Sequence, residues 1–140
     1  MATLSEDTPR IYEQSEDAVF GEIPIIASDI VYAGAAVGDS SGNGRPLAGG
    51  DAFMGFATEK TDNASGSAGD KRIKLRSKGY VKLVVTGVAS EDDHHATVYA
   101  SDDNTFTLTA SGASSIGKVH RWISSTTCIV YFEGESHRSL

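Results

Sequence analysis

Residues 72–87 read RIKLRSKGYVKLVVTG, and this stretch decides the fold. Its odd positions are apolar or small, whereas its even positions carry Lys or Arg from residue 72 to 78 and again at 82. An alternation with a period of two over this length predicts a β-strand with one face in the core and one basic face in water. Gly79 falls within this strand and predicts a bulge that bends it or divides it in two.

The rest of the chain from residue 23 onward also has the pattern of strands and turns. The further predicted strands are residues 23–26, 29–37, 51–58, 96–100, 105–109, 116–123 and 126–133. Polar and Gly-rich stretches predict loops at 38–50 and 61–70 and a hairpin turn at 101–104. No segment has a convincing helical period. The sequence therefore predicts an all-β fold, a small β-sandwich or barrel of jelly-roll-like type.

A length of 140 residues fits one domain. We expect residues 23–134 to form it, between an extended acidic N-terminal arm at 1–22 and a flexible C-terminal tail at 135–140. The arm is either a terminus without fixed structure or a segment that becomes ordered on a partner. If it serves a partner, its removal should weaken binding and leave the domain folded.

Composition argues against several classes of protein. The net charge of -7 argues against nucleic acid as the main partner, because phosphate binding depends on Lys and Arg. Cys128 is the single cysteine, so an intrachain disulfide and a zinc site of the cysteine type are excluded. The start of the chain lacks the pattern of a secretory signal, and no run approaches the ~18 apolar residues of a membrane span. We therefore expect a soluble protein without a membrane association.

The sequence offers weak candidates for a chemical site. Residues 91–95, EDDHH, are metal-ligand types, but neighbouring side chains on a strand point to opposite faces, which favours a polar turn. Residues 39–44 begin like a calcium loop, but Gly50 stands where that loop needs a bidentate glutamate. Cys128 is expected in the core and His120 at a half-buried strand position. We predict no catalytic residue, no metal and no cofactor, and hence a protein that is not an enzyme.

The basic face of the long strand is the strongest functional signal. Its cations, here called the basic ladder, are Arg72, Lys74, Arg76, Lys78 and Lys82. Like charges along a strand repel unless acids lie opposite, so the ladder either binds a partner or prevents pairing with other strands. Residues 1–22 instead carry six acids against Arg10, which suggests complementary contacts between copies or partners. We predict that the ladder binds a partner together with Arg10, Ile11 and Tyr12.

Several short motifs occur in a characteristic order. They are GFA at 55–57 after the Gly-rich loop, VVTGV at 84–88, VYASDD at 98–103 leading into TFTLT at 105–109, IGKV at 116–119 and IVYF at 129–132. This order resembles that of the head decoration proteins, or cement proteins, of tailed double-stranded DNA phages. The resemblance covers most of residues 23–133, and the EDDHH segment and the long acidic arm depart from it.

The resemblance implies a structural protein on the outer capsid surface of a virion, made in the cytoplasm of the host bacterium. Its partners would be the major capsid protein, whose neighbouring copies it would connect, and other copies of itself in a dimer or trimer. One alternative from another class stays open, a carbohydrate-binding β-sandwich module of a phage fibre or adhesin. Such modules display several aromatic side chains, whereas here Trp122 is the single tryptophan and the tyrosines are scattered along predicted strands.

Overall fold

The computed structural model describes residues 4–13 and 18–137, and nearly all of its regular structure is β. The elements of the described residues are β1 (Tyr12–Glu13), β2 (Val19–Pro24), β3 (Asp29–Val31), β4 (Ala36–Ser40), β5 (Asn43–Pro46), β6 (Ala52–Ala57), β7 (Thr61–Asn63), β8 (Arg72–Thr86), the 3₁₀ turn η1 (Glu91–Asp93), β9 (Thr97–Ala100), β10 (Phe106–Thr107), β11 (Ser114–Ser124), β12 (Thr127–Glu133) and the 3₁₀ turn η2 (Glu135–His137). The predicted all-β class is confirmed, as a closed barrel with an additional sheet.

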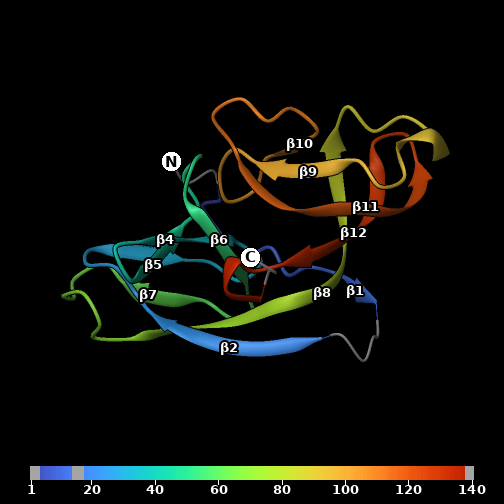
Figure 1. Ribbon diagram of the computed structural model, residues 1–140. Coiled ribbons are helices and arrows are strands. Elements are labelled where there is room, and N and C mark those ends of the chain that lie inside the picture. The colour runs from blue at the N-terminus through green and yellow to red at the C-terminus, as the bar shows by residue number, and fades with distance from the viewer. Residues whose placement is uncertain (1–3, 14–17, 138–140) are drawn as a thin grey trace.

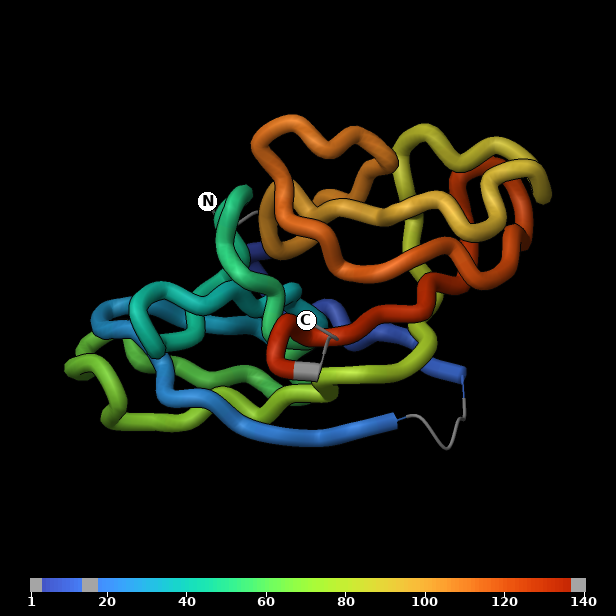
Figure 2. Tube along the Cα trace, in the orientation of Figure 1, coloured from blue at the N-terminus to red at the C-terminus, as the bar shows by residue number. Residues whose placement is uncertain are grey.

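Strand β8 is the long strand predicted from the alternating sequence. Every odd residue from Ile73 to Val85 is buried, and the even residues are half-buried or exposed. Figures 1 and 2 show β8 running along the lower part of the molecule and then turning into the upper part. The change of direction coincides with a change of partners, because β2 pairs with β8 up to Lys78 and β12 pairs with it from Lys78 onward. Gly79 follows directly and has a φ of +153°, a backbone conformation that favours glycine.

The upper part of the molecule is the closed barrel. Strand β12 pairs with the second half of β8, β11 with β12, and β9 with β11, all antiparallel. Strand β10 closes the ring, since it pairs antiparallel with β9 and parallel with Val85 and Thr86 of β8. Closure leaves these strands without an open sheet edge.

The lower part, which we call the additional sheet, is an open continuation of the same hydrogen-bonded sheet on the first half of β8. Arg76 pairs with Phe20 of β2 and with Phe56 of β6, so these two strands lie on opposite edges of β8. Strands β4 and β5 extend the sheet beyond β6, while β3 and β7 form a separate pair. This additional sheet places a second group of buried side chains around Ile73 and Leu75.

The predicted loop at residues 38–50 is wrong in part, because it contains β5 and the end of β4. The two strands form a hairpin around Ser41 and Gly42, whose φ angles are +52° and +94°. Two successive positive φ angles are typical of the turn that matches the twist of paired strands. Residues Asn43 to Pro46 have low strand propensity, so their pairing with β4 and not their composition makes them a strand.

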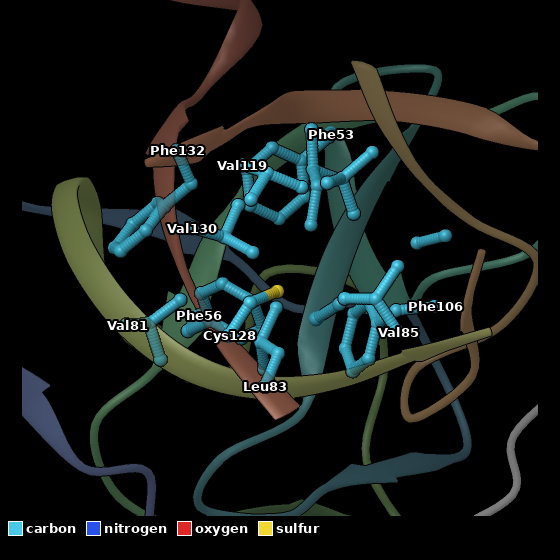
Figure 3. Packing of buried hydrophobic residues seen from close by; sticks show 14 of the residues in the cluster. Phe53, Phe56, Val81, Leu83, Val85, Phe106, Val119, Cys128, Val130 and Phe132 are labelled. Atoms are coloured by element: carbon cyan, nitrogen blue, oxygen red, sulfur yellow. The ribbon is translucent and has the colours of Figure 1, made fainter. Parts of the chain in front are cut away.

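The barrel core is built around three phenylalanines. Phe53 and Phe56 of β6 and Phe132 of β12 are fully buried and meet in edge-to-face contacts, with ring centroids 5.0 to 6.2 Å apart. Figure 3 shows Val81, Leu83 and Val85 of β8 lining the other side of this core. The buried face of the alternating strand therefore supplies one wall of the barrel.

The N-terminal segment is extended, and its described part packs on its own domain. β1 and β2 both pair with β8, and β2 runs across the predicted boundary at residue 22. The Arg10 Nε atom donates to the Gly34 carbonyl at 2.7 Å, and its guanidinium lies over the rings of Phe56 and Phe106 at 5.6 and 5.3 Å. Removal of residues 1–22 would delete β1 and most of β2, so we expect it to weaken the domain.

The ends of the predicted arm and tail are only partly described. Residues 1–3 and 14–17 of the predicted arm and residues 138–140 of the predicted tail lie outside the described residues. Of the predicted flexible tail at 135–140, residues 135–137 form the 3₁₀ turn η2. The Gly134 amide before this turn donates to the Ser77 carbonyl at 2.7 Å and ties the end of β12 to β8.

Replacing Arg10 by Ala should lower the free energy of unfolding by about 2–4 kcal/mol. The Gly34 carbonyl and the Asn104 side chain lose their hydrogen-bond donor, and the rings of Phe56 and Phe106 lose the cation that lies over them. Arg10→Lys keeps the charge without the planar fork and should have an intermediate effect. Urea unfolding followed by circular dichroism measures both. The exposed Arg72→Ala is the control and should change stability by less than about 0.5 kcal/mol. Equal stability of Arg10→Ala and Arg72→Ala would contradict anchoring by Arg10.

Candidate functional site

The basic ladder lies on the outer side of β8, as the alternation predicts. Arg72, Lys74 and Lys82 are exposed, whereas Arg76 and Lys78 are half-buried. Because β8 changes partners at Lys78, the first part of the ladder faces out from the additional sheet and Lys82 faces out from the barrel. The ladder is therefore one row of side chains on two adjoining parts of the surface.

Groups of the same chain partly compensate the charges of the ladder. Arg72 Nε lies 3.6 Å from the Glu22 carboxylate on β2, and Lys78 Nζ lies 3.8 Å from that of Glu133 on β12. The Arg76 guanidinium stacks 4.2 Å from the centre of the Tyr12 ring. The sequence suggested that the acidic and basic segments of different copies or partners attract each other, and part of this charge complementarity occurs within one chain. Lys74 and Lys82 form no ion pair with any described residue, so their charges remain available.

The three predicted binding residues of the N-terminal segment have different environments. Arg10 is held by Gly34 and also donates to the Asn104 side chain at 2.7 Å. Tyr12 packs on Phe132, and burial raises the pKa of its hydroxyl to about 12, although the charges of Arg76 and Arg10 oppose this shift. Ile11, in contrast, is 65% exposed. In this structure Arg10 and Tyr12 anchor the segment to its own domain, and Ile11 faces outward between them.

An apolar patch surrounds Lys82. The Lys82 amide donates to the Ile11 carbonyl at 2.9 Å, so Ile11, directly before β1, lies beside Lys82. Val84 follows two residues later on the same outward face and is 63% exposed. A hollow of about 350 Å³ adjoins Lys82 and Val84, and it is lined by Arg10, Lys82, Leu83, Val84, Asn104, Phe106 and Thr127. We call Ile11, Lys82, Val84 and this hollow the apolar patch.

Phe20 is a further exposed apolar residue beside the ladder. It is 65% exposed on β2, opposite Arg76, whose guanidinium lies 5.4 Å from the centre of its ring. Sequence reasoning named neither Phe20 nor Val84 as binding residues. The sequence does contain a signal for Val84: it stands at an even position of β8, where the other residues are polar or amphipathic, so the alternation predicts an apolar side chain on the outer face.

The weak metal candidates take up local structural roles. Glu91–Asp93 forms the turn η1, capped by the Ser90 side chain, and His94 accepts a hydrogen bond from the Trp122 amide at 3.2 Å. Residues 39–44 form the β4–β5 hairpin, where the Asp39 carboxylate accepts from the Gly42 amide. Within residues 4–13 and 18–137, no group of three or more His, Cys, Asp or Glu side chains is placed to hold a metal ion.

Three aromatic side chains meet on the outer face of the barrel. The Tyr80 ring of β8 lies 5.1 Å from the Tyr131 ring of β12 and 4.7 Å from the His120 ring of β11. The prediction that His120 is half-buried is wrong: it is exposed, because it follows buried Val119 and points to the outer face like Lys118. The register shift between Val119 and Arg121 leaves Arg121 exposed as well. Two hollows adjoin the cluster, of about 240 and 340 Å³. The tyrosines that are scattered in sequence are thus brought together by strand pairing.

The indole of Trp122 is not part of this aromatic cluster. It packs against the barrel core, and its Nε1 donates to the Ser125 carbonyl at 3.0 Å. The tryptophan therefore supports the β11–β12 hairpin. The aromatic surface of the barrel consists of the tyrosine and histidine rings instead.

Neither a protein-family model nor a curated protein matches the chain. In the described part of the chain, no helix has the length and apolar character needed to cross a membrane. The resemblance to phage head decoration proteins therefore stays a prediction from the motifs, and the surfaces above are the basis for any functional proposal.

Cys128 lies fully buried on β12, as predicted. Burial, with a smaller contribution from the charge of Asp93, raises the pKa of its thiol to about 11. We expect the native protein to resist a thiol-specific reagent at mildly alkaline pH and to react fully in concentrated guanidinium chloride. Labelling of the native protein as fast as that of glutathione would contradict this. Because the unfolded thiol ionises near pH 8.5, its contribution to stability should be lost as the pH rises from about 8.5 towards 11.

Proposed function

We propose that the protein is a non-enzymatic structural protein that binds the outside of a phage capsid and connects neighbouring copies of the major capsid protein. The observation that carries the proposal is the apolar patch, in which exposed Ile11 and Val84 flank a lysine without an ion pair to any described residue. The identity of the partner as a capsid protein rests on the resemblance of the sequence motifs.

The apolar patch has the features of a protein-binding surface. Burying a side chain such as Val84 or Ile11 against a partner contributes about 1.5–3 kcal/mol each. Exposed apolar groups that cluster beside polar ones mark sites of protein association more often than scattered ones do. Lys82 in the middle of the patch would select an acidic group on the partner, because opposite charge placed at an apolar contact adds specificity.

The rest of the molecule supports attachment to a repeating surface. A closed barrel fixes β8 on both edges, so the patch is presented on a rigid element and loses little conformational freedom on binding. Contacts of moderate affinity become strong when many copies, or a dimer or trimer of this protein, bind a lattice at once. The proposed location is the outer surface of the virion, after synthesis in the host cytoplasm.

Exchange of Val84 or Lys82 for Glu should weaken co-sedimentation with undecorated phage heads at least about tenfold. The first change places a carboxylate at an apolar contact, and the second reverses the charge that faces the partner. The measurement is the amount of protein that sediments with heads as a function of its concentration, at low and high salt.

Lys60→Glu is the matched control for this experiment. Replacing Lys60 by Glu changes the charge by the same amount as Lys82→Glu, but at a residue that lies over the Tyr32 ring and is not part of the apolar patch, so it should leave binding unchanged. Thermal unfolding of all variants checks that each remains folded. The proposal is wrong if the unmodified protein fails to bind heads, or if folded Val84→Glu and Lys82→Glu bind as well as Lys60→Glu.

A further inference from the structure

We infer that the outer face of β8, β11 and β12 holds a binding site for a saccharide that carries a carboxylate. The site consists of the rings of Tyr80, His120 and Tyr131, with Lys118 beside them. This inference goes beyond the proposed capsid contact and does not depend on it, since it concerns a small ligand and a different set of side chains.

Strand pairing fixes the geometry of the site. Tyr131 on β12 lies directly opposite Tyr80 on β8 and opposite Lys118 on β11, so the three side chains form a row across adjacent strands. His120 meets Tyr80 at 4.7 Å between ring centres, with the ring planes 62° apart. Two aromatic faces at an angle and an exposed ammonium group are thereby presented on rigid β-structure.

Two hollows continue the site on either side of Lys118 and Tyr131. The smaller, of about 240 Å³, is lined by Tyr80, His95, Lys118, Val119, His120 and Tyr131. The larger, of about 340 Å³, is lined by Thr97, Ser115, Gly117, Lys118, Tyr131 and Glu133. Both hollows are lined by Lys118 and Tyr131, so they adjoin each other, and we call the two together the trench. Each volume is close to the lower end of the range of about 300–1000 Å³ that is usual for small ligands.

The position of the trench on paired strands favours a saccharide over a peptide. β11 pairs with β9 and β12, and β12 pairs with β11 and β8, so an extended peptide finds no open edge here for main-chain pairing. A ligand must bind through side chains alone. Tyrosine rings offer apolar faces with a polar end, which suits the C–H face of a sugar ring, and Ser115, Thr97 and Glu133 provide polar groups for its hydroxyls.

The charges around the trench favour an acidic sugar. Lys118 is exposed, lines both hollows and forms no ion pair with any described residue. The described residues that line the smaller hollow include two histidines and Lys118 but no Asp or Glu. In the larger hollow the carboxylate of Glu133 already has Lys78 as a neighbour at 3.8 Å. The net local charge is therefore positive, in a protein whose overall charge is -7.

The test is binding of the purified full-length protein to an array of neutral, sialylated and uronic-acid glycans. Titration calorimetry with oligogalacturonate and its methyl-esterified form then compares a charged ligand with one whose carboxylates are neutralised as methyl esters. We expect binding to acidic glycans, and weaker binding of the methyl ester. Tyr131→Ala and Lys118→Ala should each weaken oligosaccharide binding about tenfold, whereas Tyr131→Phe, which keeps the ring, should retain most of it.

Tyr32→Ala is the control, because it removes a tyrosine that stacks with Lys60 at another part of the surface. Lys118→Ala changes an exposed side chain and keeps the test valid if Tyr131→Ala fails to fold. The inference is overturned if no glycan on the array binds, if neutral glycans bind as well as acidic ones, or if folded Lys118→Ala binds like Tyr32→Ala. Tighter binding of an acidic peptide than of any saccharide would also overturn it. Head co-sedimentation of the same variants reports on the capsid proposal separately.

Discussion

Main-chain pairing along both edges of β8 is the constraint on which the rest of the structure depends. One edge carries β1, β2 and, at its end, β10, while the other carries β6 and β12. The strand therefore belongs to the additional sheet in its first half and to the barrel in its second. Its buried odd residues serve two groups of core side chains, with Ile73 and Leu75 in one and Val81, Leu83 and Val85 in the other. A strand used in this way needs an alternation that continues without a break, which is what its sequence has.

The same pairing explains how an acidic segment and a basic strand coexist in one small protein. β2 places Glu22 beside Arg72, and β1 places Glu13 where its carboxylate meets Arg121 on the barrel. Exposed pairs of this kind contribute little to stability one by one. The pair of Glu22 with Arg72 reduces repulsion along β8, and Lys74 and Lys82 are the exposed ladder cations that form no ion pair with any described residue. The charges that remain, together with the exposed apolar residues beside them, define where a partner can be recognised.

The sequence predicted those features that depend on local pattern. The alternation in β8 gave a strand of nearly the correct length, the turn residues gave an all-β fold, and the apolar neighbours of Cys128 placed it in the core. Features that depend on register could not be obtained in this way. The meeting of Tyr80, His120 and Tyr131 requires knowledge of which strands pair and with what offset. Likewise, the acidic composition of residues 1–22 predicts an extended segment, while the packing of Arg10 over the rings of Phe56 and Phe106 depends on tertiary contacts that the composition does not reveal.

The anchoring of Arg10 also has a consequence for the order in which the chain acquires its structure. Its hydrogen-bond partner Asn104 lies 94 residues further along the chain, and β1 pairs with residues 80 and 81. At a synthesis rate of about 5–20 residues per second, the N-terminal segment must remain without these partners for roughly 5–20 s after it is made. Contacts so distant in sequence form late and slow the folding of the whole domain. During this interval the six acids against Arg10 give the segment the same negative net charge in every copy, so that the segments of neighbouring unfinished chains repel one another.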